Sequence, residues 1–212
     1  MTLPRLYPIL DTQTLINCGA GVELAAAAFL DGGAGILQFR HKGPWDRQTY
    51  HLVEAVARLC HDAKVPLIIN DRADFAMLLH AGLHLGQDDL PPGDGRKLLG
   101  PQAMIGFSSH NPEQLCAAAA QPVDYVALGP VFPTYSKHKP DPIVGVPLVR
   151  HCRTLLEKPL VAIGGITMAN AADVLRAGAD SVAVIAGLLP ETPTAESLTK
   201  RMDQWQRLVM SA

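Results

Sequence analysis

Two aspartates, each following a short apolar segment, are the residues best suited to bind a metal ion. Asp71 comes after Pro66–Ile69, and Asp89 comes after Leu83–Leu85 and a polar turn. Magnesium in proteins takes one or two carboxylates, and water and phosphate oxygens complete its octahedron. Taken singly, Asp71 would suit a helix cap and Asp89 an exposed turn. As a pair following neighbouring segments, they predict a magnesium site.

Three basic residues can supply the opposite charge. Arg40 and Lys42 lie two residues apart just after an apolar segment, so their side chains point to the same side of an extended chain. Lys137 lies in a later Pro-rich loop. Arginine offers a planar fork to phosphate oxygens, and lysine a point charge. Solvated surface charge is the alternative for each residue and has equal weight for Lys137. Beside two acids, the three cations favour a metal-bridged diphosphate.

A hydroxyl and two glycine-containing turns add further anion-binding candidates. Ser108 ends an apolar segment and lacks the G-x-S-x-G context of a nucleophile, so it is predicted to donate a hydrogen bond to an anion. Gly164–Gly165 and Ala186–Gly187 follow later segments, where backbone N–H groups can approach a phosphate. A tight turn is the alternative for both. The eight histidines are dispersed, and His84 is predicted to be a satisfied core residue.

Eight short apolar segments recur along the chain at intervals that leave room for helices. They are Leu6–Leu10, Gly35–Phe39, Pro66–Ile69, Leu83–Leu85, Met104–Phe107, Tyr125–Leu128, Pro159–Ile163 and Ser181–Ile185. Segments that are apolar throughout suit parallel strands buried on both faces. Polar or glycine residues follow almost every segment, as a shared site at the carboxyl ends of the strands requires.

Helices are predicted between these strands. Asp46 is expected to cap a helix whose apolar face ends at Cys60, and Asn111 to cap another with Pro112 in its first turn. The others are Asp74–Leu79, Asp94–Leu99, Asn170–Ala177 and a final helix with an apolar stripe from Ala195 to Val209. Such alternation fits a closed barrel or an open doubly wound sheet. No G-x-G-x-x-G follows the first strand, so we predict one (β/α)₈ TIM-barrel domain, residues 1–212.

Composition limits the classes of binding partner that the protein is expected to have. The formal net charge is -2, which argues against a general nucleic-acid binder. No segment has the roughly 18 uninterrupted apolar residues of a membrane helix, and we expect neither a membrane partner nor a signal peptide. The four cysteines are scattered, so we expect a reducing, cytoplasmic location without disulfides. Small phosphorylated molecules are the expected partners, and a homo-oligomer is compatible with the sequence.

Six ordered motifs carry a resemblance to a known family. They are GGAGILQFRHK (Gly32 to Lys42), PLIINDRADFAM (Pro66 to Met77), LHLGQDDLP (Leu83 to Pro91), IGFSSH (Ile105 to His110), LGPVFPTYSKHKP (Leu128 to Pro140) and AIGGIT (Ala162 to Thr167). In these motifs the chain resembles thiamine-phosphate synthase, and the likeness extends from Leu6 to Leu188.

The resemblance implies a transferase with Mg²⁺ as cofactor. It would join the diphosphate of 4-amino-5-hydroxymethyl-2-methylpyrimidine to a thiazole phosphate, carboxylated or not, giving thiamine phosphate and pyrophosphate by a dissociative route. The implied magnesium ligands are Asp71 and Asp89. The implied pyrimidine-diphosphate contacts are Gln38, Phe39, Arg40, His41, Lys42, Asn70, Ser108 and Lys137, and the implied thiazole-phosphate contacts are Thr134, Tyr135, Ser136, Gly165, Ile185 and Ala186.

The chain departs from the family pattern in a few places. His41 stands where Glu is usual, and its side chain is expected to point away from those of its neighbours. Ser136 replaces a usual Thr, and Ala186 stands where Ser is common. A one-residue shorter approach to the fourth strand aligns Asp89, rather than Asp88, with the family's metal acid. We also expect the loop Val131–Ile143 to close as a lid.

Three alternatives stay open at this point. A thiazole tautomerase of the same fold needs no diphosphate site, so the retained acids and cations favour the synthase. A sugar-phosphate isomerase or epimerase would need a poised acid–base pair, which the motifs do not specify. A non-catalytic barrel that senses a phosphorylated ligand would be expected to lose the metal acids. Release of pyrophosphate from the two precursors separates the synthase from all three.

Overall fold

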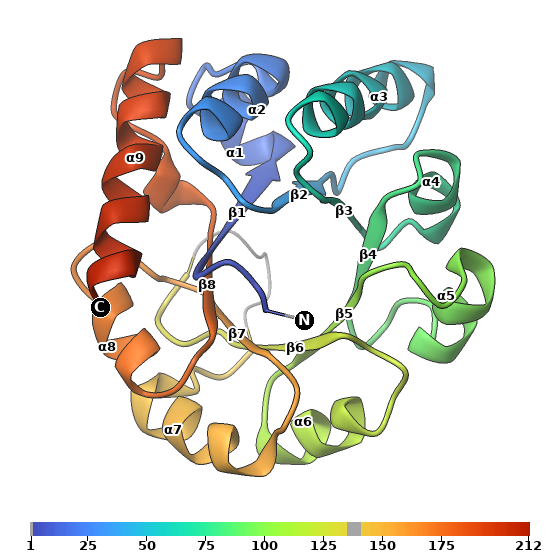
Figure 1. The fold of residues 1–212 in the computed structure, drawn as a ribbon, viewed down its shortest axis with the longest axis vertical. Helices are drawn as coiled ribbons and strands as arrows, with labels where there is room; N and C mark the ends of the chain where they lie inside the picture. The colour runs from blue at the N-terminus through green and yellow to red at the C-terminus, as the bar shows by residue number, and fades with distance from the viewer. Residues whose placement is uncertain (1, 135–140) are drawn as a thin grey trace.

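A closed barrel of parallel strands is surrounded by helices (Figure 1). The computed structural model describes residues 2–134 and 141–212. Each strand pairs with the next in chain order, and β8 pairs with β1, so the sheet has no edge. The strands are β1 Leu6–Asp11, β2 Leu37–Arg40, β3 Leu67–Asn70, β4 Gly82–Leu85, β5 Ile105–Ser109, β6 Tyr125–Leu128, β7 Leu160–Ile163 and β8 Ser181–Val184. The predicted (β/α)₈ fold is confirmed, and every predicted strand segment overlaps one observed strand.

The helices form the outer layer of the barrel. They are α1 Thr12–Asn17, α2 Val22–Asp31, α3 Arg47–Asp62, α4 Ala73–Leu78, α5 Pro92–Leu99, α6 Pro112–Ala119, α7 Gly145–Leu155, α8 Ala171–Arg176, the 3-10 helix η1 Ala186–Leu188 and α9 Ala195–Ser211. Both predicted caps are present: Asp46 accepts from the backbone N–H of Thr49, and Asn111 from that of Gln114. The sequence did not predict α1 or α7.

Two apolar layers hold the barrel together, and the alternation of strand residues separates them. On β1, Tyr7 and Ile9 face the barrel interior, whereas Leu6 and Leu10 face the surrounding helices. The interior layer is small and includes tyrosines, and the outer layer is large and aliphatic. Polar side chains can therefore occupy the interior near the carboxyl ends of the strands without weakening the main core.

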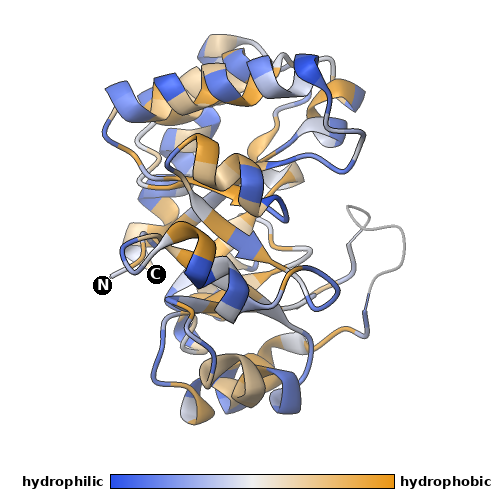
Figure 2. Cartoon of the chain, turned by 90° about the vertical axis from the view of Figure 1, so that its right-hand side faces the viewer, coloured by the Kyte–Doolittle hydropathy of each residue, from blue (hydrophilic) through white to orange (hydrophobic). Residues whose placement is uncertain are grey.

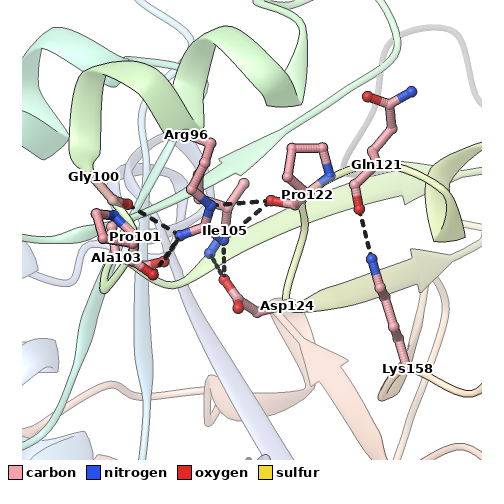
Figure 3. Close-up of polar contacts among 9 residues, drawn as sticks. All are labelled: Arg96, Gly100, Pro101, Ala103, Ile105, Gln121, Pro122, Asp124 and Lys158. Carbon is pink, nitrogen blue, oxygen red and sulfur yellow. Dashed lines mark hydrogen bonds and ion pairs between the residues drawn. The ribbon is translucent and has the colours of Figure 1, made fainter.

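The two ends of the barrel differ in what they contain. Figure 2, turned by 90°, shows both chain termini at the end where the strands begin. At that end the guanidinium of Arg96 fastens two loops, and Figure 3 shows its contacts. The acceptors are the carbonyl oxygens of Gly100, Pro101, Ala103 and Pro122 and the carboxylate of Asp124. Asp124 also accepts from the N–H of Ile105, the first residue of β5.

A second arginine–aspartate pair has the same arrangement two strands further on. Arg153 donates to Asp180, and Asp180 accepts from the N–H of Leu160, the first residue of β7. Nearby, Lys158 donates to the carbonyl oxygen of Gln121 at 2.6 Å (Figure 3). These contacts join successive βα units at the end of the barrel that lies away from the predicted site.

A membrane-crossing helix is absent from the part of the chain that the structure describes: none of its helices combines the needed length with the needed apolar character.

Candidate active site

An ion pair joins the carboxyl ends of β1 and β2. Arg40 pairs with Asp11, and the two side chains are 16% and 5% exposed. The other carboxylate oxygen of Asp11 accepts from the backbone N–H of Thr14 at 2.9 Å, which caps α1. Asp11 therefore holds the guanidinium of Arg40 at the carboxyl ends of these two strands. The sequence did not indicate this partnership.

The two predicted magnesium ligands lie together, with a lysine beside them. Lys42 Nζ is 2.5 Å from Asp71 Oδ2. Burial raises the pKa of the Asp89 carboxyl, and a hydrogen bond to Asp71 together with the charge of Asp71 raises it further. The backbone N–H of Gly86, 2.7 Å from Asp89 Oδ2, and the charge of Lys42 act against this rise. Asp88 is exposed, whereas Asp89 is half-buried and faces Asp71.

The backbone of Asp71 is held in an uncommon conformation. Its φ is 68°, in the left-handed region that residues other than glycine seldom adopt. Its N–H donates to the carbonyl oxygen of His84 at 2.8 Å, which ties the end of β3 to β4. Asp71 does not cap α4, whose N-cap residue is Arg72 and has no side-chain cap bond. The helix-cap alternative for Asp71 is therefore wrong.

The side-chain amide of Asn70 is a candidate hydrogen-bond donor to a ligand. Asn70 is 6% exposed and ends β3, directly before Asp71. Within residues 2–134 and 141–212, its Nδ2 is buried and has no hydrogen-bond acceptor. Because an unpaired buried donor costs free energy, this atom indicates a ligand oxygen at the site.

A chain of hydrogen bonds crosses the barrel interior beneath the acids. Gln38 Nε2 donates to Tyr7 Oη at 3.1 Å, and Tyr7 Oη lies 2.7 Å from Tyr125 Oη. His84 Nδ1 is 3.0 Å from Tyr125 Oη, and His84 Nε2 is 2.9 Å from Ser108 Oγ. Burial lowers the pKa of His84 to about 4 and raises the pKa of both tyrosines. The prediction of a satisfied core histidine is confirmed.

An aromatic cluster lies beside Lys42, in the loop between β2 and α3. The Trp45 ring is 4.4 Å from the ring of Phe75 on α4, and the guanidinium carbon of Arg72 lies 5.1 Å from the Trp45 ring centroid. His41 contacts the edge of Trp45, and its Nδ1 is 2.8 Å from the hydroxyl of Thr12. The cluster joins the loop that carries Lys42 to the loop that carries Asp71. The sequence did not predict this cluster.

Two glycines after β7 are required by a close approach of the chain. Gly164 and Gly165 have φ of 99° and 64°, and a Cβ on Gly165 would lie 2.4 Å from the carbonyl oxygen of Pro133. Their absent side chains therefore admit the loop that follows β6. Phe132 N–H donates to the carbonyl oxygen of Gly164 at 3.0 Å, which fixes that loop over the turn.

The remaining predicted residues are placed in part. Phe39 lies on β2 in the outer apolar layer, so its side chain points away from the barrel interior. Ile185 follows β8, and Ala186 begins η1 directly after it. Thr134 ends the described part of the loop after β6 and is half-buried. Tyr135, Ser136 and Lys137, with the rest of the predicted lid between residues 135 and 140, lie outside the described residues.

A divalent cation fits the acid pair. Within the described residues, no group of three or more His, Cys, Asp or Glu side chains could hold a metal. A two-carboxylate site is nevertheless the arrangement in which magnesium completes its coordination with water and substrate phosphate. The mutual repulsion that raises the pKa of Asp89 would be relieved by a bound cation. The donor set and the electrostatics therefore agree with such an ion.

Fold and site together define a (β/α)₈-barrel enzyme with an acid pair and basic side chains at the carboxyl ends of its strands. A model of the thiamine monophosphate synthase family matches residues 6–188. A thiamine-phosphate synthase of Koribacter versatilis is 46% identical over 195 residues, which are 89% of this chain and 90% of that protein. The chain belongs to the thiamine monophosphate synthase family.

Further relatives agree in sequence and in fold. A thiamine-phosphate synthase of Chloroflexus aurantiacus is 37% identical over 206 residues, covering 97% of this chain and 92% of that protein. The solved thiamine phosphate pyrophosphorylase of Pyrococcus furiosus has a TM-score of 0.84 at 28% identity, covering 98% of this chain and 96% of that one. The resemblance noted in the sequence is therefore confirmed.

Proposed function

We propose that this chain joins a pyrimidine methyl diphosphate to a thiazole phosphate, with thiamine phosphate and pyrophosphate as products. The observation that carries the proposal is the meeting of Asp71, Asp89 and Lys42 at one end of the barrel, with Arg40 held nearby by Asp11. A metal-bound diphosphate needs this combination of acids and cations. The family membership reported above supports the same reaction.

Asp71 and Asp89 would hold Mg²⁺, which when bound supplies positive charge to the leaving diphosphate. Lys42 is half-exposed, so its ammonium can turn from Asp71 toward a phosphate oxygen. Arg40 and Ser108 would contact the same group, and the unpaired amide of Asn70 would donate to it. We propose Gln38 as a contact of the pyrimidine ring. Lys137 remains a predicted diphosphate ligand.

The proposed route is dissociative. The bond between the pyrimidine methylene carbon and the diphosphate oxygen breaks, and its electron pair leaves with pyrophosphate. The ring amino group delocalises the positive charge left on the methylene. The thiazole nitrogen then donates its lone pair to form the new C–N bond. The protein's task is to stabilise the leaving group, hold the thiazole close and exclude water.

The second substrate would lie toward β6, β7 and β8. We propose that the turn at Gly165, the residues Ile185 and Ala186 at η1, and Thr134 hold the thiazole phosphate. Tyr135 and Ser136 stay predicted contacts. Small phosphorylated substrates as partners and a cytoplasmic location are part of the same proposal.

An assay with both purified precursors tests the proposal. With Mg²⁺ present, the protein should release pyrophosphate and form thiamine phosphate in equal amounts, and EDTA should abolish both. Asp71→Asn should lower kcat by ~10²-fold or more, because one of two magnesium ligands is weakened. Asp94→Asn, an exposed acid of α5 paired with Lys97, is the matched control and should keep full activity. A thiazole product without pyrophosphate release would indicate the tautomerase instead.

A further inference from the structure

The hydrogen-bonded chain inside the barrel joins two residues on opposite sides of the site. Its ends are Gln38 on β2 and Ser108 on β5, and its interior members are Tyr7, Tyr125 and His84. Tyr7 and Tyr125 are 1% and 0% exposed, and His84 is 8% exposed. The proposed reaction assigns no proton transfer to the three interior residues, so their conspicuous polarity needs another explanation.

The hydrogen-bonded series is rigid because its aromatic rings are tightly packed. The Tyr125 ring stacks on His84 with an interplanar angle of 19° and meets Tyr7 edge-on, with ring centroids 5.8 Å apart. A Cβ on Gly106 would lie 2.0 Å from the Tyr125 ring, so glycine at this position of β5 makes space for the phenol. The hydroxyl of Tyr125 is thereby held between Tyr7 and His84.

The direction of every hydrogen bond in this series follows from Gln38, the residue at one end of it. Gln38 Nε2 donates to Tyr7, so the hydroxyl hydrogen of Tyr7 is left for its other partner, Tyr125. Tyr125 then donates to His84 Nδ1, because its buried hydroxyl hydrogen would otherwise be left without an acceptor. A neutral imidazole with an acceptor Nδ1 carries its hydrogen on Nε2.

Ser108, at the other end of the hydrogen-bonded series, supports the same hydrogen-bond directions. With its hydrogen on Nε2, His84 donates to Ser108 Oγ, 2.9 Å away, and the hydroxyl hydrogen of Ser108 is then directed elsewhere. An anion at the site requires a donor there, and the reverse direction would turn a lone pair of Ser108 toward negative phosphate oxygens. Meanwhile Gln38 uses its Nε2 on Tyr7, and among residues 2–134 and 141–212 its Oε1 has no hydrogen-bond donor.

We propose that Tyr7, Tyr125 and His84 are positioning residues, which fix Ser108 as a donor to the diphosphate and Gln38 as an acceptor toward the pyrimidine. The direction of one hydrogen bond sets the direction of all the others, so both ends of a single substrate are matched together. The acceptor of Gln38 suits an N–H group such as the exocyclic amine of an aminopyrimidine. This inference rests on the proposed function for the identity of the substrate, but not for the direction of the chain.

The tautomer of His84 tests the direction without any turnover. Two-bond ¹H–¹⁵N correlation spectra of the full chain labelled with ¹⁵N-histidine distinguish the protonated ring nitrogen from the other, and His84→Gln identifies the signals. We expect hydrogen on Nε2 in the free protein and after addition of Mg²⁺ and inorganic pyrophosphate. A hydrogen on Nδ1 in the pyrophosphate-bound state would overturn the proposal, whether or not the protein forms thiamine phosphate.

Three single-hydroxyl deletions test the effect on the substrate. Tyr125→Phe removes the donor to Nδ1, so both tautomers should appear and KM for the pyrimidine diphosphate should rise about tenfold. Tyr7→Phe should raise the same KM but keep the Nε2–H tautomer. KM for the thiazole phosphate should change less than about twofold in both variants. Tyr50→Phe, which loses a surface hydroxyl 3.5 Å from Glu54, is the matched control and should change neither constant.

These outcomes separate positioning from a merely structural role. A lower Tm in Tyr125→Phe with both KM values and the His84 tautomer as in the wild type would overturn the proposal. If Tyr125→Phe does not fold, the wild-type tautomer and Tyr7→Phe still decide it. If the wild type has the Nε2–H tautomer but forms no thiamine phosphate, the proposed function fails while the direction of the chain stands.

Discussion

Individual side chains at the rim are arranged in pairs of opposite charge. Arg40 is bound by Asp11 and is nearly buried, whereas Lys42 is bound by Asp71 and is half-exposed. An entering diphosphate can therefore draw Lys42 away at little cost, since exposed ion pairs contribute little free energy. Arg40 stays fixed by its partner. We infer that the arginine provides a rigid anchor and the lysine an adjustable one.

His84 predicts how stability depends on pH. Its pKa is about 4 in the folded protein, below the ordinary histidine value of 6.5, so between these two pH values the unfolded chain binds more protons. Stability is therefore complete above pH 6.5 and falls as pH decreases toward 4. Urea unfolding at pH 7.5 and pH 5 should show that His84 accounts for a loss of about 2 kcal/mol. His84→Gln should remove this part of the loss.

The control for this prediction is His51→Gln. His51 is 65% exposed on α3, and the substitution should leave the pH dependence as in the wild type. The prediction would fail if His84→Gln and wild-type protein lost equal stability between the two pH values.

Loops between strands and helices decide where the charged groups lie. The loop after β2 carries Lys42, and that after β3 carries Asp71, and Trp45 joins them by packing against Phe75 and Arg72. Cation–π and ring contacts of this kind are worth about 0.5–2 kcal/mol each. That is enough to restrict a short loop, and a misplaced cation lowers the affinity for an anion.

Replacing Trp45 tests this role of the aromatic cluster. Trp45→Leu should raise KM for the pyrimidine diphosphate about fivefold, because the loop that carries Lys42 is no longer held in place. Steady-state kinetics with each substrate varied in turn measures the effect. Asp74→Asn is the control, since it removes only the ion pair of Arg72 and leaves the ring contacts. Unchanged kinetics in Trp45→Leu would show that the loop holds its shape without the cluster.

The strands and the capped helices could be predicted from sequence because their signals are local. Apolar segments mark the strands, and Asp46 and Asn111 mark the starts of α3 and α6. By contrast, α1 is six residues long and has no apolar periodicity, and α7 begins at Gly145 without a side-chain cap. Short or uncapped helices depend on tertiary packing, which a single sequence does not display.

The site was predictable to the extent that its residues follow strands. Asp71, Asp89, Arg40 and Lys42 all lie at carboxyl ends of strands, and the barrel brings them together. Their partners could not be predicted. Whether Arg40 would bind Asp11 depends on the register of β1 against β2, in which these two residues are opposite each other. The register of a closed barrel is a property of all its strands.

The two ends of the barrel have different roles: one carries the proposed active site, and the other carries contacts that stabilise the fold. Polar groups at the carboxyl ends of the strands are paired in ways that a ligand can rearrange. Those at the other end, Arg96 with Asp124 (Figure 3) and Arg153 with Asp180, bind backbone groups at the starts of β5 and β7. This division is common in barrels of this type.

Arg96→Met tests the separation. It should lower the free energy of unfolding by about 2–3 kcal/mol, because several carbonyl oxygens and a carboxylate lose their donor. Both KM values should stay as in the wild type. Arg176→Met, which breaks an exposed pair with Asp173 on α8, should cost less than about 0.5 kcal/mol. A change in KM after Arg96→Met would contradict the division.

The proposed reaction depends on a divalent ion and a diphosphate meeting at Asp71 and Asp89. A crystal soaked with Mn²⁺ and pyrophosphate, measured at the manganese absorption edge, tests this most directly. We predict one anomalous peak between these two carboxylates, with pyrophosphate oxygens on the ion, on Lys42 and on Ser108. Pyrophosphate and manganese bound elsewhere on the barrel, with the two aspartates free of metal, would contradict the account.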